Sequence, residues 1–127
     1  METPLSKTCK SGNKVLVEYL VEHGADINKE KLNSGGLLFY ACKSGNKNLV
    51  EYLVEHGANI NKENSSNITP LFYECNSGNK YLVEYLVEHG ADINKNEENG
   101  STPLFCACIN RYKDLVKYLK KLGARYK

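Results

Sequence analysis

The sequence predicts an all-α fold in which short antiparallel helix pairs stack into a solenoid. The ten residues LVEYLVEHGA begin at Leu16 and recur from Leu49 and from Leu82, so the period is 33 residues. The tetrapeptide SGNK precedes each copy at the same distance. One unit of this size cannot bury its own apolar residues, but stacked neighbours can bury them together.

The period divides the chain of 127 residues into one domain of four repeats, at 3–35, 36–68, 69–101 and a shortened 102–127. The ends of a stack have no neighbour and should be polar. Ser6 and Lys7 stand in the first repeat where later repeats carry aromatic residues, and Lys120 and Lys121 replace Val and Glu in the last. We therefore expect a complete four-repeat domain with a polar cap at each end.

The first helix of a repeat is predicted to begin at a threonine followed by a proline. Thr69 and Thr102 each precede a proline, and this pair caps the helix and presets its first turn. The second repeat has Gly36 there, so its helix should lack a side-chain cap. First helices end at a glycine that can adopt the left-handed conformation. Arg111 replaces that glycine in the last repeat, which predicts strain or a shifted turn.

The second helix of a repeat is predicted from an apolar stripe with a period of 3.6 residues. In the second repeat the stripe is Leu49, Val50, Leu53 and Val54, and Asn46 can cap the helix. A polar loop follows, and in the third repeat it contains Asn-Gly, a strong hairpin-turn signal. The asparagines that recur at the start of the loops are expected to bond their own backbone in a turn. They are Asn28, Asn61 and Asn94.

Two segments carry a resemblance to a known family. Thr69-Pro70-Leu71-Phe72-Tyr73 and Gly90-Ala91-Asp92-Ile93-Asn94, with the period of 33 residues, resemble ankyrin repeats over residues 3–127. The resemblance implies helix pairs joined by projecting hairpin loops, and a protein that binds other proteins through the concave face of the stack. The histidine that the family carries after Pro-Leu is replaced here by phenylalanine, as at Phe72.

Cysteines and histidines recur with the repeat. They are Cys9, Cys42, Cys75 and Cys108, and His23, His56 and His89. Equivalent residues in stacked helices lie roughly 8–10 Å apart. A disulfide needs Cα atoms within about 7 Å, so these cysteines are too far apart to pair. The histidines are likewise too far apart to share one zinc ion. We expect these residues to be structural. Cys106 falls at a position that varies between repeats, so an exposed, reactive thiol is expected there.

Composition narrows the function further. The net charge is +2, too small to indicate nucleic-acid binding, and no apolar run reaches the length of a membrane-spanning helix. The N-terminal residues lack the apolar core of a secretory signal, and no phosphate-binding loop motif occurs. We expect a non-catalytic monomer that binds another protein, with no cofactor, metal, nucleic acid or membrane. Unpaired cysteines favour an intracellular, cytoplasmic location.

Positions that differ between repeats predict the binding surface, because the positions that match serve as framework. In the family, these variable positions line the concave groove. The predicted partner-binding residues are Lys7, Lys10, Leu32, Asn33, Tyr40, Lys43, Ser65, Ser66, Ile68, Tyr73, Asn76 and Glu98. Tyr40 and Tyr73 are the expected anchors, since tyrosine is enriched at binding hot spots. Leu32 and Ile68 are expected to be exposed apolar residues at loop tips.

Three alternatives stay open. The near-identity of the second and third repeats suits an engineered or consensus-like scaffold without a natural partner. An enzyme or metal protein would use the cysteine or histidine series. Binding of an anionic ligand would use residues 111–127, which carry seven basic side chains against one acidic, a net charge of +6.

Overall fold

The structure is a computed structural model that describes residues 7–8, 12–28 and 36–127. Within those ranges the chain forms helices and no strand, which confirms the predicted all-α class. The helices are α2 (Lys14–Glu22), α3 (Leu37–Ser44), α4 (Lys47–Glu55), α5 (Pro70–Ser77), α6 (Lys80–Glu88), α7 (Pro103–Ile109) and α8 (Lys113–Lys121). None of these helices is long and apolar enough to cross a membrane.

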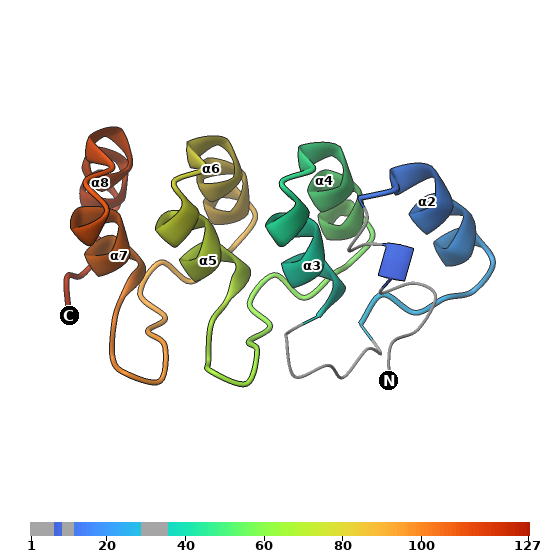
Figure 1. Ribbon diagram of the computed structural model, residues 1–127, viewed down its shortest axis with the longest axis horizontal. Helices are drawn as coiled ribbons and strands as arrows, with labels where there is room; N and C mark the ends of the chain where they lie inside the picture. Colours follow the sequence, from blue (N-terminus) through green and yellow to red (C-terminus); the bar gives the residue numbers. More distant parts are fainter. Residues whose placement is uncertain (1–6, 9–11, 29–35) are drawn as a thin grey trace.

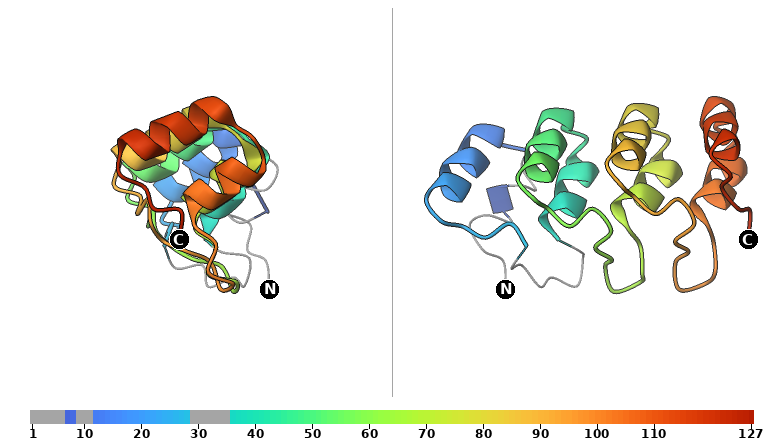
Figure 2. Two further views of the ribbon diagram at one scale, coloured as in Figure 1. Left: turned by 90° about the vertical axis from the view of Figure 1, so that its left-hand side faces the viewer. Right: turned by 180° about the vertical axis from the view of Figure 1, so that it is seen from behind.

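The helices stand in two rows along the long axis of the molecule (Figure 1). We call α3, α5 and α7 the first-helix row, and α2, α4, α6 and α8 the second-helix row. The loops at 56–69 and 89–102 leave the end of a second helix, project past the first-helix row and return to the next first helix (Figures 1 and 2). This arrangement confirms the solenoid of stacked antiparallel helix pairs.

The predicted capping residues begin two of the first helices. Thr69 Oγ1 accepts a hydrogen bond from Phe72 N at 3.2 Å. Thr102 Oγ1 accepts one from Phe105 N at 3.1 Å. A proline follows each threonine at the start of the helix. Helix α3 begins after Gly36 with no side-chain cap, as the sequence predicts, so its first turn lacks a contribution of about 1 kcal/mol.

The second helices are capped by asparagine. The side-chain oxygens of Asn13, Asn46 and Asn79 each accept a hydrogen bond at 3.1 Å from the backbone N–H three residues further on. Helix α8 follows Tyr112, which makes no side-chain cap, and it carries Asp114 in its first turn instead. An acidic residue there interacts favourably with the helix dipole.

The turn between the two helices of a repeat requires a positive φ angle. Gly45 and Gly78 adopt φ of 72° and 84°. Arg111 takes the same place in the last repeat with φ of 60°, which confirms the predicted strain. Such a conformation costs a residue with a side chain about 1–2 kcal/mol. Gly78 has a second reason to be glycine, because a Cβ there would lie 2.7 Å from Cζ of Tyr112.

The apolar core runs between the two rows and is continuous from repeat to repeat. Its largest contributors are leucines. Those fully or almost fully buried are Leu37, Leu38, Leu49, Leu53, Leu71, Leu82, Leu86, Leu104, Leu115 and Leu119. Each fully buried leucine stabilises the fold by about 1.5–3 kcal/mol relative to an exposed one. Since neighbouring repeats complete the burial, the core belongs to the stack and not to any single repeat.

Asparagine side chains at the start of the loops join each repeat to the next. Asn61 Nδ2 donates to the carbonyl oxygen of Gly90 at 3.2 Å, and Asp92 N donates to Asn61 Oδ1 at 2.9 Å. Asn28 makes the same pair of bonds with the second repeat, and Asn94 Oδ1 accepts from the C-terminal segment. The expectation that these side chains bond their own backbone is wrong, because the amide reaches the adjacent repeat.

The loops turn back as hairpins without forming strands. In the last loop, Glu97 N donates to Ser101 O at 3.0 Å, and Gly100 N donates to Glu97 O at 2.9 Å. The turn requires a positive φ, which Gly100 adopts at 87°. Asn67 holds the same position in the preceding loop with φ of 62°. Asparagine tolerates this conformation better than most residues, so both loops keep the same shape.

The two ends of the stack differ. Lys120 and Lys121 are exposed at the C-terminal end, as the sequence predicts. At the other end, helix α2 exposes the apolar residues Val15, Leu16 and Tyr19. The expectation of a polar N-terminal end is therefore wrong for α2. The equivalents of Leu16 are buried in the later repeats, and those of Tyr19 are buried or half-buried.

One charged residue lies inside the core of the third repeat. Glu74 of α5 is buried where the neighbouring repeats carry Ala41 and Ala107. Its Oε1 accepts a hydrogen bond from Ser77 Oγ at 2.8 Å, but no described residue bonds its Oε2. Burial raises the pKa of Glu74 to about 7, although hydrogen bonds from Ser77 and Cys42 partly oppose this.

We expect Glu74 to make the stability of the fold depend on pH. In the unfolded state Glu74 loses its proton above its ordinary pKa of 4.5, whereas in the folded state it keeps the proton up to about pH 7. The stability that depends on protonated Glu74 is therefore fully present below pH 4.5 and is lost as pH rises through about 7. The full loss corresponds to about 3 kcal/mol. Urea unfolding at pH 5 and pH 8 should show this fall in wild type, and Glu74→Gln should reduce it. Equal pH slopes in the two proteins would contradict the assignment.

Candidate partner-binding surface

The candidate surface consists of the exposed parts of α3, α5 and α7 together with the loop tips. Lys43, Asn76 and Ile109 lie at the C-terminal ends of the three helices, one per repeat, and all three are exposed. The framework beneath them is the buried core, and the first-helix row holds it rigid. These three positions are equivalent in the repeat but differ in charge, polarity and size.

The two predicted tyrosine anchors have different environments. Tyr40 is 5% exposed and belongs to the core cluster, so the prediction of an exposed anchor there is wrong. Its ring lies on the face of α3 that packs into the core. Tyr73 is half-buried, and its ring lies 5.5 Å from that of Phe39 at a tilt of 58°. Lys43 Nζ lies 5.9 Å from the centre of the same Phe39 ring.

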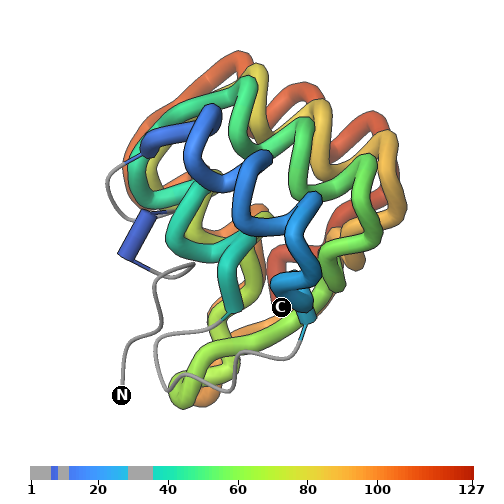
Figure 3. The backbone as a smooth tube through the Cα atoms, turned by 90° about the vertical axis from the view of Figure 1, so that its right-hand side faces the viewer, coloured from blue at the N-terminus to red at the C-terminus, as the bar shows by residue number. Residues whose placement is uncertain are grey.

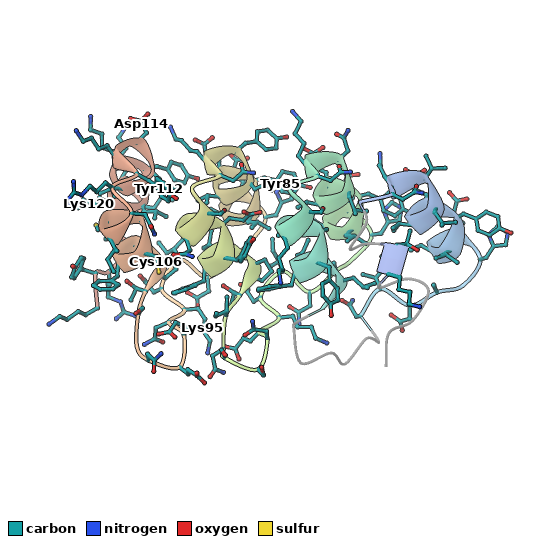
Figure 4. The ribbon with its side chains drawn as sticks, viewed as in Figure 1. Tyr85, Lys95, Cys106, Tyr112, Asp114 and Lys120 are labelled. Carbon is teal, nitrogen blue, oxygen red and sulfur yellow. The ribbon has the colours of Figure 1, made fainter. Side chains whose placement is uncertain are left out.

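The loop tips contribute polar groups. Ser65 and Glu98 are exposed, and Ser66 is half-buried. Glu98 N donates to Ser66 O at 3.1 Å, which joins the second and third loops. Lys95, labelled in Figure 4, pairs with Glu63 across the same two loops at 2.8 Å and lowers the pKa of Glu63. The loops are therefore held in a fixed relation to each other.

Five of the predicted residues remain, and the structure describes two of them. Ile68 is half-buried, so the expectation of an exposed apolar residue at the loop tip is wrong. Its N–H donates to Asn64 Oδ1 at 3.0 Å, and its carbonyl oxygen accepts from Asn64 N at 3.0 Å. These two bonds hold Ile68 at the base of the hairpin. Lys7 is exposed. Lys10, Leu32 and Asn33 lie outside the described residues.

The partner-binding residues predicted from the sequence leave out two features of the surface. Ile109 is 58% exposed, and it could have been chosen because it shares the variable position of Lys43 and Asn76. The second is an open depression of about 330 Å³ at the C-terminal end, whose walls include Phe105 and Tyr126. Their rings meet edge to face at 5.2 Å. The signal for this site is that Tyr126 breaks a series of isoleucines in the repeat.

The histidines at the ends of the second helices are engaged with tyrosines of the same helices. The Nδ1 atoms of His23, His56 and His89 each lie 2.8 Å from the carbonyl oxygen four residues earlier. Each ring also stacks on the ring of that tyrosine with centres 4.0 Å apart. Across the described part of the chain, no group of three or more metal-ligating side chains comes together.

The thiols are mostly buried. Cys42 and Cys75 lie in the core, and burial raises the pKa of both. Cys106, labelled in Figure 4, is 8% exposed, and burial raises its pKa to about 11. The expectation of an exposed, reactive Cys106 is therefore wrong. Its position varies between repeats, but its side chain is buried, as that of Tyr40 is.

Comparison with known proteins gives one match. The sequence model of a family described as ankyrin repeats (3 copies) matches residues 1–64 and 38–127. No curated protein matches the chain at a significant level. The two matched segments overlap and together extend over all four repeats.

We expect Cys106 to react slowly in the native protein. The thiolate is the reactive form of a cysteine. At neutral pH, a thiol with a pKa of about 11 has about a hundredfold smaller fraction of thiolate than one with the ordinary pKa of 9.0. Alkylation followed by peptide mass mapping should therefore label Cys106 at least tenfold more slowly in buffer than in urea. The half-buried Cys108 on the same helix serves as the internal control. Equal rates with and without urea would show that Cys106 is accessible after all.

Proposed function

Because the chain belongs to the ankyrin-repeat family, whose members are generally protein–protein interaction modules, we propose that it binds another protein through its concave face. We take that face to be the corner between the first-helix row and the loop tips (Figure 2). The proposal is of a non-catalytic, monomeric, cytoplasmic protein. It would act without cofactor or metal and without binding nucleic acid or membranes.

The observation that supports the proposal is that the repeated positions are buried, whereas exposed positions on the first helices differ from repeat to repeat. The repeated leucines of α4, α6 and α8 are buried, whereas Lys43, Asn76 and Ile109, which share one position of the first helix, are exposed and all different. A rigid row that presents different side chains at regular intervals suits recognition of an extended surface on a partner. Binding costs less when the contact residues are already ordered.

The chemistry of the surface indicates what it would contact. Its middle carries the half-buried ring of Tyr73, and its C-terminal end carries Ile109 and the depression beside Phe105. Asn76 is a polar group between these apolar sites, and its Oδ1 accepts a hydrogen bond from Asn110 Nδ2 at 3.1 Å. The surface therefore suits a partner segment with apolar side chains separated by polar ones.

The alternatives rest on other features. An engineered or consensus-like scaffold fits the similarity of the central repeats, but the uncapped Gly36 and the strained Arg111 count against deliberate design. Anion binding would use the basic end of the stack, where an open depression of about 620 Å³ is lined by residues of α6 and α8, among them Lys80, Lys117 and Lys120. That depression lies outside the proposed concave surface.

A cross-linking experiment tests which face binds the partner. A photoreactive amino acid is placed at Asn76 on the first-helix row or at Glu88 on the second-helix row, both exposed. In an extract of the source organism, we expect one protein to be captured from position 76 and not from position 88. Capture from position 88 alone would contradict the concave-face assignment.

The captured protein, once purified, allows a quantitative test. Ile109→Asp should weaken its binding at least tenfold, because a carboxylate would replace an exposed apolar contact, which corresponds to about 1.4 kcal/mol. Glu88→Lys is the matched control and should leave the Kd unchanged. Both variants should unfold at the wild-type urea midpoint, since both side chains are exposed. Wild-type affinity of Ile109→Asp would refute the role of this surface.

A further inference from the structure

Helix α8 has the opposite net charge to the other second helices. Each of α2, α4 and α6 carries one lysine and two glutamates, a net charge of −1. Helix α8 carries four lysines and one aspartate, a net charge of +3. Figure 3 looks along the stack and shows the second helices parallel to one another. Equivalent residues therefore hold equivalent places on each helix, and the change of sign is confined to α8.

The lysine that begins each second helix lacks an acidic partner on α8. On α6, Lys80 Nζ lies 3.5 Å from Glu84 Oε1, and the equivalent pair on α2 is separated by 3.3 Å. On α8 the residue four positions after Lys113 is Lys117, and Lys121 follows four positions later. Like charges at this spacing destabilise a helix. Three lysines in one line therefore repel each other where α6 has an ion pair.

The need for a polar end of the stack does not explain this change of sign. Lys117 and Lys121 stand where α6 has Glu84 and Glu88, which are already charged. Glutamate would keep that surface polar as well as lysine does. A lysine in the last turn suits the helix dipole, but α2, α4 and α6 all end in glutamate. The lysines of α8 therefore indicate a role beyond capping.

These lysines line an open depression of about 620 Å³ on α6 and α8. Its walls consist of one tyrosine and five charged side chains, and two of the charged residues are labelled on α8 in Figure 4. The charged residues are Lys80, Asp114, Lys117, Lys120 and Lys121. Four lysines and one aspartate give the walls a net charge of +3. The volume lies within the range of about 300–1,000 Å³ that is usual for small-molecule sites.

The lysines that α8 contributes to this depression are available to a ligand. Within the ranges that the structure describes, no ion pair includes Lys117, Lys120 or Lys121. All three side chains are exposed. The fourth lysine, Lys80, shares its charge with Glu84. The walls therefore combine a hollow surface with three cations that no carboxylate neutralises, which favours an anionic ligand.

The charge of the rest of the chain favours a compact anion. Residues 111–127 have a net charge of +6, whereas residues 1–110 have a net charge of −4. A nucleic acid or an anionic membrane would extend past α8 and meet this acidic body, which would repel it. A small molecule would contact α8 and the start of α6 alone. Phosphate is the anionic group that lysine commonly binds, through the point charge of its ammonium group.

We propose that this depression binds a small soluble molecule that carries several phosphate groups. The phosphates contact the ammonium groups of Lys117, Lys120 and Lys121, and Lys80 lies on the α6 side of the site. The bound anion relieves the repulsion among the lysines of α8. This site lies outside the concave surface, so it does not depend on the proposed protein partner.

Calorimetric titration with sodium tripolyphosphate tests the site on the whole chain. We expect one site per chain. Its Kd should be at least about tenfold larger in about 0.5 M NaCl than in about 0.05 M, because salt screens exposed charges. Vesicles of phosphatidylcholine with phosphatidylinositol bisphosphate offer the same phosphate chemistry on a membrane. Tripolyphosphate should bind at least about tenfold more tightly than the lipid headgroup does, and the reverse order would overturn the choice of a soluble ligand.

Charge-reversal variants locate the site. Lys117→Glu with Lys121→Glu gives α8 the residues that α6 has at these positions, and it should weaken tripolyphosphate binding at least about tenfold. Its urea midpoint should not fall below that of wild type, because Lys113 gains an acidic partner. The matched control, Lys14→Glu with Lys47→Glu, makes the same change of net charge on α2 and α4. It should change the Kd less than about twofold.

A substitution of the opposite sign completes the test. Asp114→Asn removes the carboxylate from the walls and should tighten binding at least about twofold. Three results would overturn the site: no binding of tripolyphosphate to wild type, an equal loss of affinity in the control variant, and no gain of affinity in Asp114→Asn. Binding at the concave face is tested separately, because every one of these variants leaves Asn76 and Ile109 unaltered.

Discussion

The packing of each repeat against the one before it is the interaction on which the structure depends. A unit of 33 residues has one apolar stripe and no means of covering it alone. Leu49, Leu82 and Leu115 are buried in repeats that have a preceding neighbour, whereas the equivalent Leu16 of the first repeat is 44% exposed. The asparagine bridges of the loops add directed hydrogen bonds to this non-directional contact, and so fix the register between repeats.

This constraint separates the residues that hold the stack from those free to contact a partner. The buried leucine positions of the second-helix row repeat unchanged. Variation falls on exposed positions, such as the one shared by Val15, Asn48, Tyr81 and Asp114, on the first-helix ends, on the loop tips and on the two ends of the stack. The ends differ in kind, since Lys120 is exposed at one and the apolar Leu16 at the other.

Much of the fold could be predicted because its signals are local. The period, the threonine and asparagine caps, and the strain at Arg111 follow from the sequence within a repeat. The orientation of Tyr40 and Cys106 could not, because a position that varies between repeats can face either the groove or the core. A position that differs between repeats is not bound by the repeat pattern, but it need not be exposed. The buried Glu74 could not be predicted for the same reason, because it is a charged residue at a buried position that is otherwise alanine.

The most direct test of this account compares one substitution at two equivalent positions. Leu82→Ala removes a side chain sealed by the preceding repeat, and urea unfolding should show a loss of about 2–5 kcal/mol. Leu16→Ala removes the same side chain where no described helix precedes, and the loss should stay below about 1 kcal/mol. Equal losses at the two positions would contradict the claim that burial between repeats stabilises the stack.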